Sequence, residues 1–522
     1  MVSDVEEQIE ITPQFAETLE LLENTSRSVF ITGKAGTGKS TLLRVFRDNT
    51  KKKVVVLAPT GVAALNVKGQ TIHSFFRFKP DITQDKVKKI TKKGNKNIYK
   101  EVDTIVIDEI SMVRADLLDC VDKFLRLNSS KAKEPFGGKQ LVFIGDLYQL
   151  PPVVKTKERE IFKTWYETPY FFSAHAFQDL PFEFIELEKI FRQKDETFIE
   201  ILNAIRNGTV TNELLAILNQ RYKPDYVPGE GEFYVYLTPL NRLANQINEE
   251  QLAKIPGPTY NLTGVIEGEF EERDLPTEKV ISLKVGAQVM LLNNDPYGQW
   301  VNGSVGKVVD VEKDKSGEVK TVVVELRDGE EVYVEPFTWE IFEYQYDEKS
   351  ASIKTHTLGS FTQFPLRLAW AITIHKSQGK TFDRIILDLT GGAFSPGQVY
   401  VALSRCTTLE GIVLKQPLQK KHIFMDWKVP RFLSAYQYRI AEEKMPQEEK
   451  IRFLREAMEE KKSLEIVYLK GNDEKSRRVI DPLYVGELDY EGKKFTGLQA
   501  YCHKRKEIRN FRIDRILEIK KI

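Results

Sequence analysis

The segment GKAGTGKST at residues 33–41 constrains the fold more than any other part of the sequence. It follows a short apolar strand, SVFIT at 28–32, and precedes a helical stretch, STLLRVFRD at 40–48. A phosphate-binding loop requires this context, because glycines let backbone N–H groups face phosphate oxygens at a helix N-terminus. The alternative is a strand-to-helix turn with chance glycines, which the spacing of the glycines and the Lys-Ser pair disfavours. We predict nucleotide contacts by Gly33, Ala35, Gly36, Thr37, Gly38, Lys39, Ser40 and Thr41.

Apolar, β-branched runs recur along the chain and predict parallel sheets. Four runs separated by helix-compatible segments indicate a doubly wound α/β sheet in the N-terminal part, and three more indicate a second α/β domain. Between 285 and 365, short strands with Gly/Asp turns are typical of a small antiparallel barrel. The parallel runs lie at 28–32, 53–60, 104–109 and 140–145, then at 233–239, 366–379 and 384–389.

Two acidic residues end the strand TIVIDE at 104–109. After a phosphate-binding loop, Asp108 is expected to hold a Mg²⁺ shell with Ser40, and Glu109 to orient or deprotonate the attacking water. An acid pair at a strand end can also just cap the next helix. Arg405 and Arg192 are candidates to contact the γ-phosphate from the second domain, although a surface salt bridge is the commoner role of a lone arginine. These features alone leave a motor, a nucleotide kinase and a switch open.

Composition adds mostly exclusions. The 522 residues suggest about three to four domains. A net charge of +1 requires any basic surface to be local, and three cysteines far apart in sequence argue against a disulfide framework and fit a reducing compartment. The acidic start and the lack of a long apolar run predict a cytoplasmic protein with no membrane segment.

The motifs occur in an order that resembles one helicase family. They are Gln14 in TPQ, GKAGTGKST, APTGVAALNVKGQTIHSFF, VIDEISMV, PFGGKQLVFIGDLYQLPPV, LEKIFRQKD, AITIHKSQGKTFD and GQVYVALSRC. Over about residues 10–412 the chain resembles the Pif-one type of superfamily 1B DNA helicases, which are related to the RecD and Dda helicases. The segment that includes EPFGGKQ is similar to the insert that separates this type from its relatives.

The resemblance implies a role for each matching residue near the nucleotide. Gln14 would recognise adenine, Gln149 would sense the γ-phosphate, and Gly379 would line the nucleotide from the second domain. Arg192 and Arg405 would contact the γ-phosphate at the domain junction. Lys380 fills a place that varies in the family pattern. The resemblance also assigns a wedge insertion to about 77–100, where the sequence itself suggests a hairpin or loop, and a Src-homology-3-like barrel to about 300–365.

Single-stranded DNA crosses both motor domains in this family, so the resemblance also implies DNA contacts. Small hydroxyls, backbone amides and histidines suit phosphate and sugar contacts without base reading. Core packing is the alternative for each Phe and for the two histidines, although the TIH triplet occurs in both domains. The residues are Thr60, Gly61, His73, Ser74 and Phe75 in the first domain, and His375, Lys376 and Ser377 in the second.

Residues 450–522 resemble a WYL domain, a small Sm-like barrel. The Trp-Tyr-Leu run that names this domain aligns with Thr496-Gly497-Leu498, so two of its three residues are absent. The tail is basic, and Arg505, Arg509 and Arg512 are its candidate phosphate contacts, with Tyr501 and Phe511 nearby. The alternative is a solvated face, with the aromatic rings in the core and Arg515 paired to Asp514 or Glu518.

The sequence therefore predicts an ATP- and Mg²⁺-dependent DNA helicase with two RecA-like domains, acting as a monomer on single-stranded and forked DNA. Only the resemblance implies 5′-to-3′ polarity. The alternatives are a DNA-stimulated ATPase that remodels protein–DNA complexes and a ligand-regulated DNA-binding switch. The expected boundaries are 1–185 and 186–430 for the motor domains, 431–449 for a linker or helix, and 450–522 for the WYL-like domain.

Overall fold

The computed structural model describes residues 11–90, 98–155, 158–229, 231–471, 473–490 and 492–522. The chain divides into two compact units, one of residues up to 206 and 210–424, and one of 425–522 with 207–209. Within the described ranges, no helix is long and apolar enough to cross a membrane.

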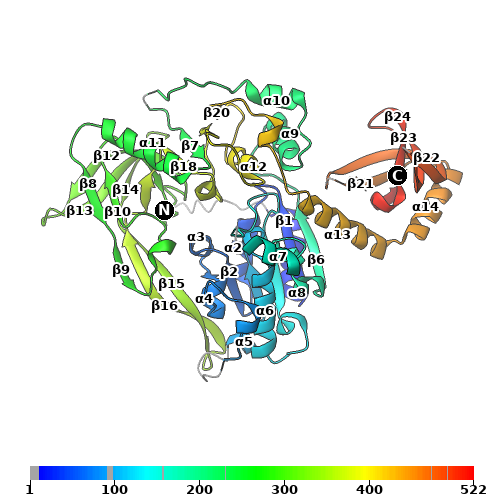
Figure 1. Ribbon diagram of the computed structural model, residues 1–522, viewed down its shortest axis with the longest axis horizontal. Helices are drawn as coiled ribbons and strands as arrows, with labels where there is room; N and C mark the ends of the chain where they lie inside the picture. The colour runs from blue at the N-terminus through cyan, green and yellow to red at the C-terminus, as the bar shows by residue number, and fades with distance from the viewer. Residues whose placement is uncertain (1–10, 91–97, 156–157, 230, 472, 491) are drawn as a thin grey trace, which may run out of the picture. The chain divides into compact units, whose positions relative to one another are not determined.

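A six-stranded parallel sheet, in the order β3-β2-β4-β5-β1-β6, forms the N-terminal part of the first unit (Figure 1). Its central strands are buried on both faces, as their unbroken apolar runs require. The strands are β1 Ser28–Gly33, β2 Val54–Ala58, β3 Gln70–Thr71, β4 Thr104–Ile107, β5 Gln140–Ile144 and β6 Phe182–Leu187. The helices of this part are α1 Pro13–Asn24, α2 Lys39–Asn49, α3 Gly61–Asn66, α4 Ile72–Phe76, α5 Ile98–Glu101, α6 Ala115–Asn128, α7 Arg159–Trp165 and α8 His175–Gln178.

A second parallel sheet follows in the same unit, in the order β18-β7-β19-β20. Its strands are β7 Val235–Thr238, β18 Ala371–Thr373, β19 Ile385–Leu387 and β20 Ile412–Leu414. Its helices are α9 Glu196–Arg206, α10 Asn212–Asn219, α11 Asn241–Lys254 and α12 Gln398–Leu403, and the 3-10 turn η7 spans His375–Ser377. The mixed α/β class with two parallel sheets agrees with the sequence prediction.

Antiparallel strands interrupt the second sheet between α11 and β18. They form a five-stranded sheet, β14-β13-β12-β11-β17, a three-stranded sheet, β15-β16-β9, and the pair β10-β8. The strands are β8 Tyr260–Thr263, β9 Val265–Gly268, β10 Val280–Leu283, β11 Gln288–Leu291, β12 Val305–Lys313, β13 Val319–Leu326, β14 Glu331–Val334, β15 Phe337–Asp347, β16 Ser352–Gln363 and β17 Leu366–Leu368.

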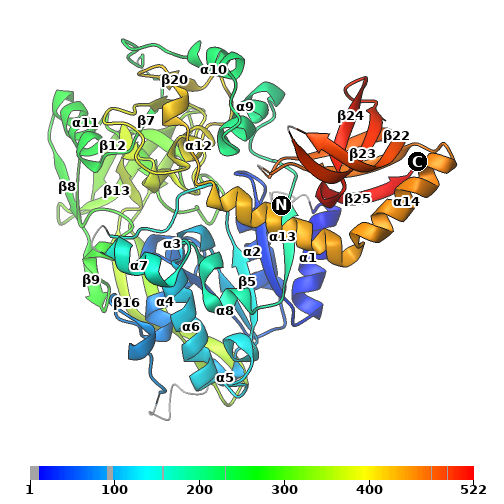
Figure 2. The ribbon, with the colours of Figure 1, turned by 45° about the vertical axis from the view of Figure 1, so that its right-hand side comes forward.

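The long β15–β16 hairpin reaches back to the first sheet, as Figures 1 and 2 show. Tyr344 on β15 accepts a hydrogen bond from the backbone N–H of Val56, and Arg77 forms an ion pair with Glu343 at 3.1 Å. The predicted wedge lies beside this hairpin. Residues 91–97 of the wedge fall outside the described residues, and the described part of 77–100 contains the 3-10 turn Gln84–Lys86 and the start of α5 but no strand.

The second unit holds α13 Lys428–Lys444, α14 Gln447–Glu459 and a five-stranded antiparallel sheet in the order β24-β23-β22-β21-β25. Leu454 and Ala457 of α14 pack with Leu464, Ile480 and Leu498 in its core. The strands are β21 Leu464–Leu469, β22 Lys475–Tyr490, β23 Lys493–Cys502, β24 Glu507–Arg512 and β25 Ile516–Lys521.

Candidate nucleotide and DNA site

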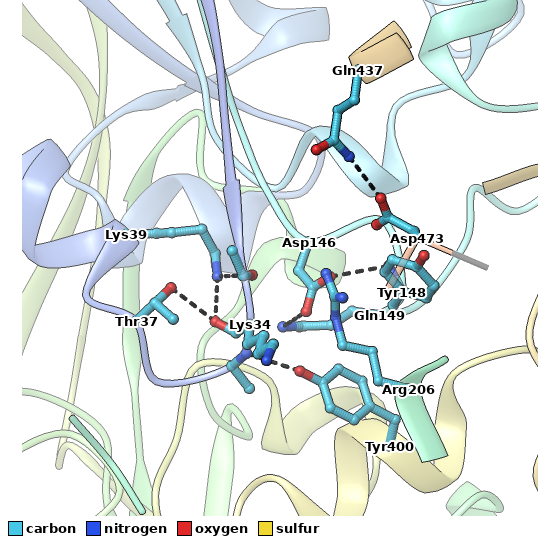
Figure 3. A network of polar contacts seen from close by, with 12 residues as sticks. Lys34, Thr37, Lys39, Asp146, Tyr148, Gln149, Arg206, Tyr400, Gln437 and Asp473 are labelled. Carbon is cyan, nitrogen blue, oxygen red and sulfur yellow. Dashed lines mark hydrogen bonds and ion pairs between the residues drawn. The ribbon is translucent and has the colours of Figure 1, made fainter. Parts of the chain in front are cut away.

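The loop 33–38 turns sharply from β1 into α2. Gly33, Gly36 and Gly38 have φ values of 153°, 80° and 84°, and the last two are left-handed conformations that favour glycine. Lys39 Nζ donates hydrogen bonds to the carbonyl oxygens of Gly33 at 2.7 Å and Lys34 at 2.9 Å, as drawn in Figure 3. The loop thus presents amides and an ammonium group at a helix N-terminus, which is the arrangement that binds phosphate.

Helix α12 and the loop after β6 contact the phosphate-binding loop directly. The backbone N–H of Ala35 donates to the Tyr400 hydroxyl on α12 at 2.9 Å, and the N–H of Phe191 donates to the Gly36 carbonyl at 2.8 Å. A Cβ atom on Gly36 would lie 2.6 Å from the Cβ of Arg192, so only glycine allows this approach. The contacts bring Arg192 beside the phosphate-binding loop.

Arg192 and Arg405 lie close together. Arg405 is 2% exposed and donates to the Val401 carbonyl and the Ser404 hydroxyl, while Arg192 donates to the Ser404 carbonyl at 3.0 Å. Burial, and then the charge of Arg405, lower the pKa of Arg192 to about 9. Arg405 is buried and Arg192 half-buried, and two mutually repelling guanidinium groups this close together suit an anion such as the γ-phosphate of ATP.

The acid pair lies at the end of β4. Asp108 is 8% exposed, and burial followed by the charge of Glu109 raises its pKa to about 7. Burial also raises the pKa of Glu109, whereas the charges of Lys39 and Arg405 oppose this shift. Glu109 has a φ of 49°, an uncommon conformation for a residue other than glycine, which indicates local strain at this position.

Oxygen ligands for Mg²⁺ are available from the Asp108 carboxylate and the Ser40 hydroxyl at the first turn of α2. Such hard oxygen donors fit Mg²⁺, which usually takes one or two protein carboxylates together with substrate phosphates. Among the described residues, no cluster of three or more His, Cys, Asp or Glu side chains could hold a metal by itself.

Gln149 follows β5 on a buried segment. Its side-chain amide lies 3.4 Å from the Asp146 carboxylate, which also accepts from the N–H of Tyr148 and pairs with Arg206 at 3.4 Å (Figure 3). The start of α12 packs on this segment, because a Cβ atom on Gly397 would lie 2.7 Å from the Gln149 carbonyl oxygen. The helix that carries Tyr400 and precedes Arg405 is thereby seated on the Gln149 segment.

Sequence reasoning missed three of these residues. Tyr400 lies in the motif GQVYVALSRC. A hydroxyl group among apolar neighbours could have marked Tyr400 as a buried hydrogen-bonding residue. Asp146 follows the core strand β5, and Arg206 is the last residue of the amphipathic helix α9. Nothing in the sequence indicates that these two residues pair. Arg206 is 3% exposed, and its guanidinium carbon lies 3.9 Å from the centre of the Tyr148 ring. The ion pair between Arg206 and Asp146 is therefore buried.

Two of the predicted nucleotide contacts, Gln14 and Gly379, lie outside the phosphate-binding loop. The Gln14 amide donates to the Glu186 carbonyl at 2.7 Å and accepts from the N–H of Glu188, so it is engaged with the end of β6. Gly379 has a φ of 75° and faces open space after η7.

The predicted DNA contacts divide into exposed and buried groups. Thr60 is exposed and caps α3, and Ser74, His375 and Lys376 are exposed; His73 is half-buried. Desolvation lowers the pKa of His375. Gly61 lies close to the Asp274 carboxylate. A Cβ atom added to Gly61 would be 2.5 Å from an oxygen of that carboxylate.

Phe75 and Ser377 do not fit the predicted contacts. Phe75 is 4% exposed and packs edge-on against Phe76 and Tyr99, so core packing explains it better than base stacking. Ser377 is fully buried, and its hydroxyl donates to the Ile374 carbonyl at 2.7 Å. Core packing, the alternative given for Phe75, therefore describes this ring, and a DNA contact by Ser377 stays a prediction.

The tail arginines lie on or beside β24 with exposed side chains. Arg512 pairs with Asp514 at 2.7 Å and Arg509 with Glu507 at 3.3 Å, so the ion pair that the alternative placed on Arg515 belongs to Arg512. Phe511 is 3% exposed and belongs to the core, as the alternative held. Arg505 lies in the exposed turn between β23 and β24.

A phosphate-binding loop, a strand-end acid pair and two arginines, Arg192 in the loop after β6 and Arg405 just after α12, define a P-loop nucleoside triphosphatase with two parallel sheets. Residues 5–214 match the model of the PIF1-like helicase family, and residues 449–521 match that of the WYL domain. The ATP-dependent DNA helicase Pif1 of Bdellovibrio bacteriovorus is 33% identical over 443 residues, which cover 82% of this chain and 93% of that protein. The chain belongs to the PIF1-like helicase family and carries a C-terminal WYL domain.

Two solved structures of a Bacteroides Pif1 are also similar to this chain. Its complex with ADP-AlF4 has a TM-score of 0.74 at 38% identity and covers 82% of this chain and 97% of that one. The same relative bound to single-stranded DNA has a TM-score of 0.58 at 37% identity, with equal coverage. The fold therefore matches the nucleotide complex more closely than the DNA complex.

Proposed function

We propose that this helicase hydrolyses ATP to translocate 5′ to 3′ on single-stranded DNA and to unwind forked or structured DNA. The observation that carries the proposal is the contact between Ala35 of the phosphate-binding loop and Tyr400 of α12, the helix between β19 and β20 of the second sheet. A nucleotide at this junction would touch both domains. Its γ-phosphate can therefore favour closure of the two domains, and hydrolysis can let them open again.

We propose a role for each residue at the nucleotide, and the geometry of the site supports these roles. Lys39 binds the β- and γ-phosphates, Glu109 orients or deprotonates water, and Gln149 senses the γ-phosphate. Arg192 and Arg405 stabilise the charge that develops on the transferred phosphate. Ser40 and Asp108 would hold Mg²⁺, which supplies neutralising charge when bound. Gln14 would exchange its backbone partners for adenine, and Gly379 would lie near the nucleotide.

The strand would cross exposed groups on both parallel sheets. Thr60, Gly61, His73 and Ser74 belong to the first, and His375 and Lys376 to the second. Such groups bind phosphate and sugar, so translocation would not depend on sequence. The Bacteroides relative bound to single-stranded DNA supports this substrate.

We also propose a domain layout. Residues 1–185 and 186–430 would form RecA-like motor domains, with the wedge at about 77–100 and a Src-homology-3-like barrel at about 300–365. Residues 431–449 would connect them to an Sm-like WYL domain at 450–522, and the protein would be a monomer in solution.

Arg505, Arg509 and Arg512 would add phosphate contacts, so replacing all three with alanine should reduce the salt dependence of single-strand binding. An unchanged dependence would remove the WYL domain from the binding surface.

A tailed-duplex assay tests the activity. We expect ATP-dependent unwinding of a duplex with a 5′ single-stranded tail and none with a 3′ tail. Unwinding from the 3′ tail alone would overturn the polarity. DNA-stimulated hydrolysis without unwinding of either substrate would favour a translocase that remodels protein–DNA complexes, and binding without stimulated hydrolysis would favour a ligand-regulated switch.

A further inference from the structure

A group of basic side chains gathers around the turn η7, outside the nucleotide contacts. Lys380 follows η7, Lys376 lies within it, and Arg367 is on the neighbouring strand β17. The charge of Arg367 lowers the pKa of both lysines, after the larger effect of their desolvation, so Arg367 lies within electrostatic reach of each lysine. The carboxylate of Glu278 opposes part of this charge.

Lys380 and Arg367 are held in place by neutral groups. Lys380 Nζ donates to the side-chain oxygen of Asn302 at 2.6 Å. Arg367 donates through one terminal nitrogen to the Pro276 carbonyl oxygen, and its Nε is buried and has no hydrogen-bond partner. Buried cations are usually paired, because desolvating a charge is costly unless an opposite charge compensates it. An arriving anion would therefore be bound strongly here.

The surroundings indicate which anion this is. The side chain of Asn302 also approaches Asn66 at 3.5 Å, and Asn66 ends α3, the helix that begins at Gly61 beside Thr60. The group thus lies between two segments with exposed, DNA-contacting candidates, one from each parallel sheet. The phosphates of ATP instead have Lys39, Arg192 and Arg405. A strand that passes from Thr60 to His375 would bring its backbone past Lys380.

We propose that Arg367, Lys376 and Lys380 form a binding site for a backbone phosphodiester group of single-stranded DNA, with Asn302 positioning Lys380. The inference rests on the proposed function. Arg367 can offer more than one N–H to the phosphate, whereas the lysines act as point charges. Lys380 thereby gains a role at the place where the family pattern varies.

The test is the salt dependence of binding to a fluorescein-labelled oligothymidylate, measured by anisotropy. Lys380→Gln removes the charge but keeps a donor for Asn302, and Arg367→Gln removes the second charge. Each should weaken binding several-fold and lower the slope of log Kd against log salt by about 0.7, the value for one phosphate contact on a single strand. Lys380→Arg should restore the slope. Lys315→Ala, in an exposed turn between β12 and β13, is the matched control and should keep the parental slope.

Three outcomes would overturn the inference. One is a parental slope in both glutamine variants, and another is a lower melting temperature with an unchanged slope, which would make the cluster structural. The third is a loss of affinity for an ATP analogue without DNA, which would assign the cluster to the nucleotide. If the parental protein itself fails to bind the oligonucleotide, the proposed function fails instead.

Discussion

The backbone N–H of Ala35 donates a hydrogen bond to the hydroxyl of Tyr400 at 2.9 Å, although 365 residues separate them in the chain. Both residues are buried, at 6% and 3% exposure. The buried amide of the phosphate-binding loop is therefore satisfied by a side chain of α12. This bond links elements that belong to the two parallel sheets.

Tyr400→Phe should destabilise the nucleotide-free protein, because a buried N–H without a partner costs about 1–3 kcal/mol. The loss should be smaller with an ATP analogue bound, which supplies other acceptors to the loop. Thermal melts with and without the analogue measure the difference, and Tyr333→Phe, on an exposed tyrosine, is the control. Equal melting temperatures for variant and parent in both conditions would show that the bond contributes nothing.

Glu109→Gln should bind ATP and DNA but lose turnover by about 10²–10⁴-fold, since general base catalysis typically contributes that much. The amide keeps the size of the side chain but cannot take a proton from water. Phosphate release measures turnover, and a fluorescent ATP analogue measures binding. Hydrolysis at the parental rate would refute the role of Glu109.

Gln149→Ala should reduce the stimulation of ATP hydrolysis by DNA more than it weakens ATP binding. Gln149 lies on the segment on which α12 is seated, so its loss should disturb the signal between the domains rather than the phosphate-binding loop. The ratio of hydrolysis rates with and without single-stranded DNA gives the coupling. A raised Kd for ATP with a normal ratio would contradict this expectation.

Arg206→Ala should lower the free energy of unfolding by roughly 3–5 kcal/mol, because it leaves the buried Asp146 carboxylate without its partner. Arg206→Met combined with Asp146→Asn should cost less, since no charge is then left buried alone. Denaturant titrations of the single and double variants make the comparison. A single variant as stable as the parent would mean that the ion pair is energetically neutral.

Single-strand binding should weaken as pH rises through about 7. Burial and the charge of Arg367 lower the pKa of Lys380 to about 7, so Lys380 is charged below that pH and mostly neutral above it. A backbone phosphate is attracted only by the charged form of Lys380. Arg367 is the charged group that acts on Lys380, while Lys376 and Glu278 interact with Arg367. His375, whose pKa is lowered from 6.5 by desolvation, would act only at lower pH.

Anisotropy titrations from about pH 6 to about pH 9 test this dependence. Lys380→Arg should abolish it, because arginine keeps its charge over the whole range. The same pH dependence in the arginine variant would assign the effect to another group.

Local patterns determined much of this protein. The strand, glycine spacing and helix of 28–48 specified the phosphate-binding loop, and the apolar runs specified two parallel sheets with antiparallel strands between them. The end of β4 located Asp108 and Glu109. These features depend on neighbours in sequence and on a fixed side-chain period, so they can be read before any tertiary contact is known.

Tertiary structure alone decided the long-range pairs. Tyr400 meets Ala35, Arg206 meets Asp146, and Lys380 meets Asn302, although nothing in the local sequence links the members of each pair. Phe75 was read as a base-stacking candidate but turned out to be a core residue, because neighbouring elements close over it. A charge or a ring acquires its role from what is packed against it, and that depends on how sheets distant in sequence come together.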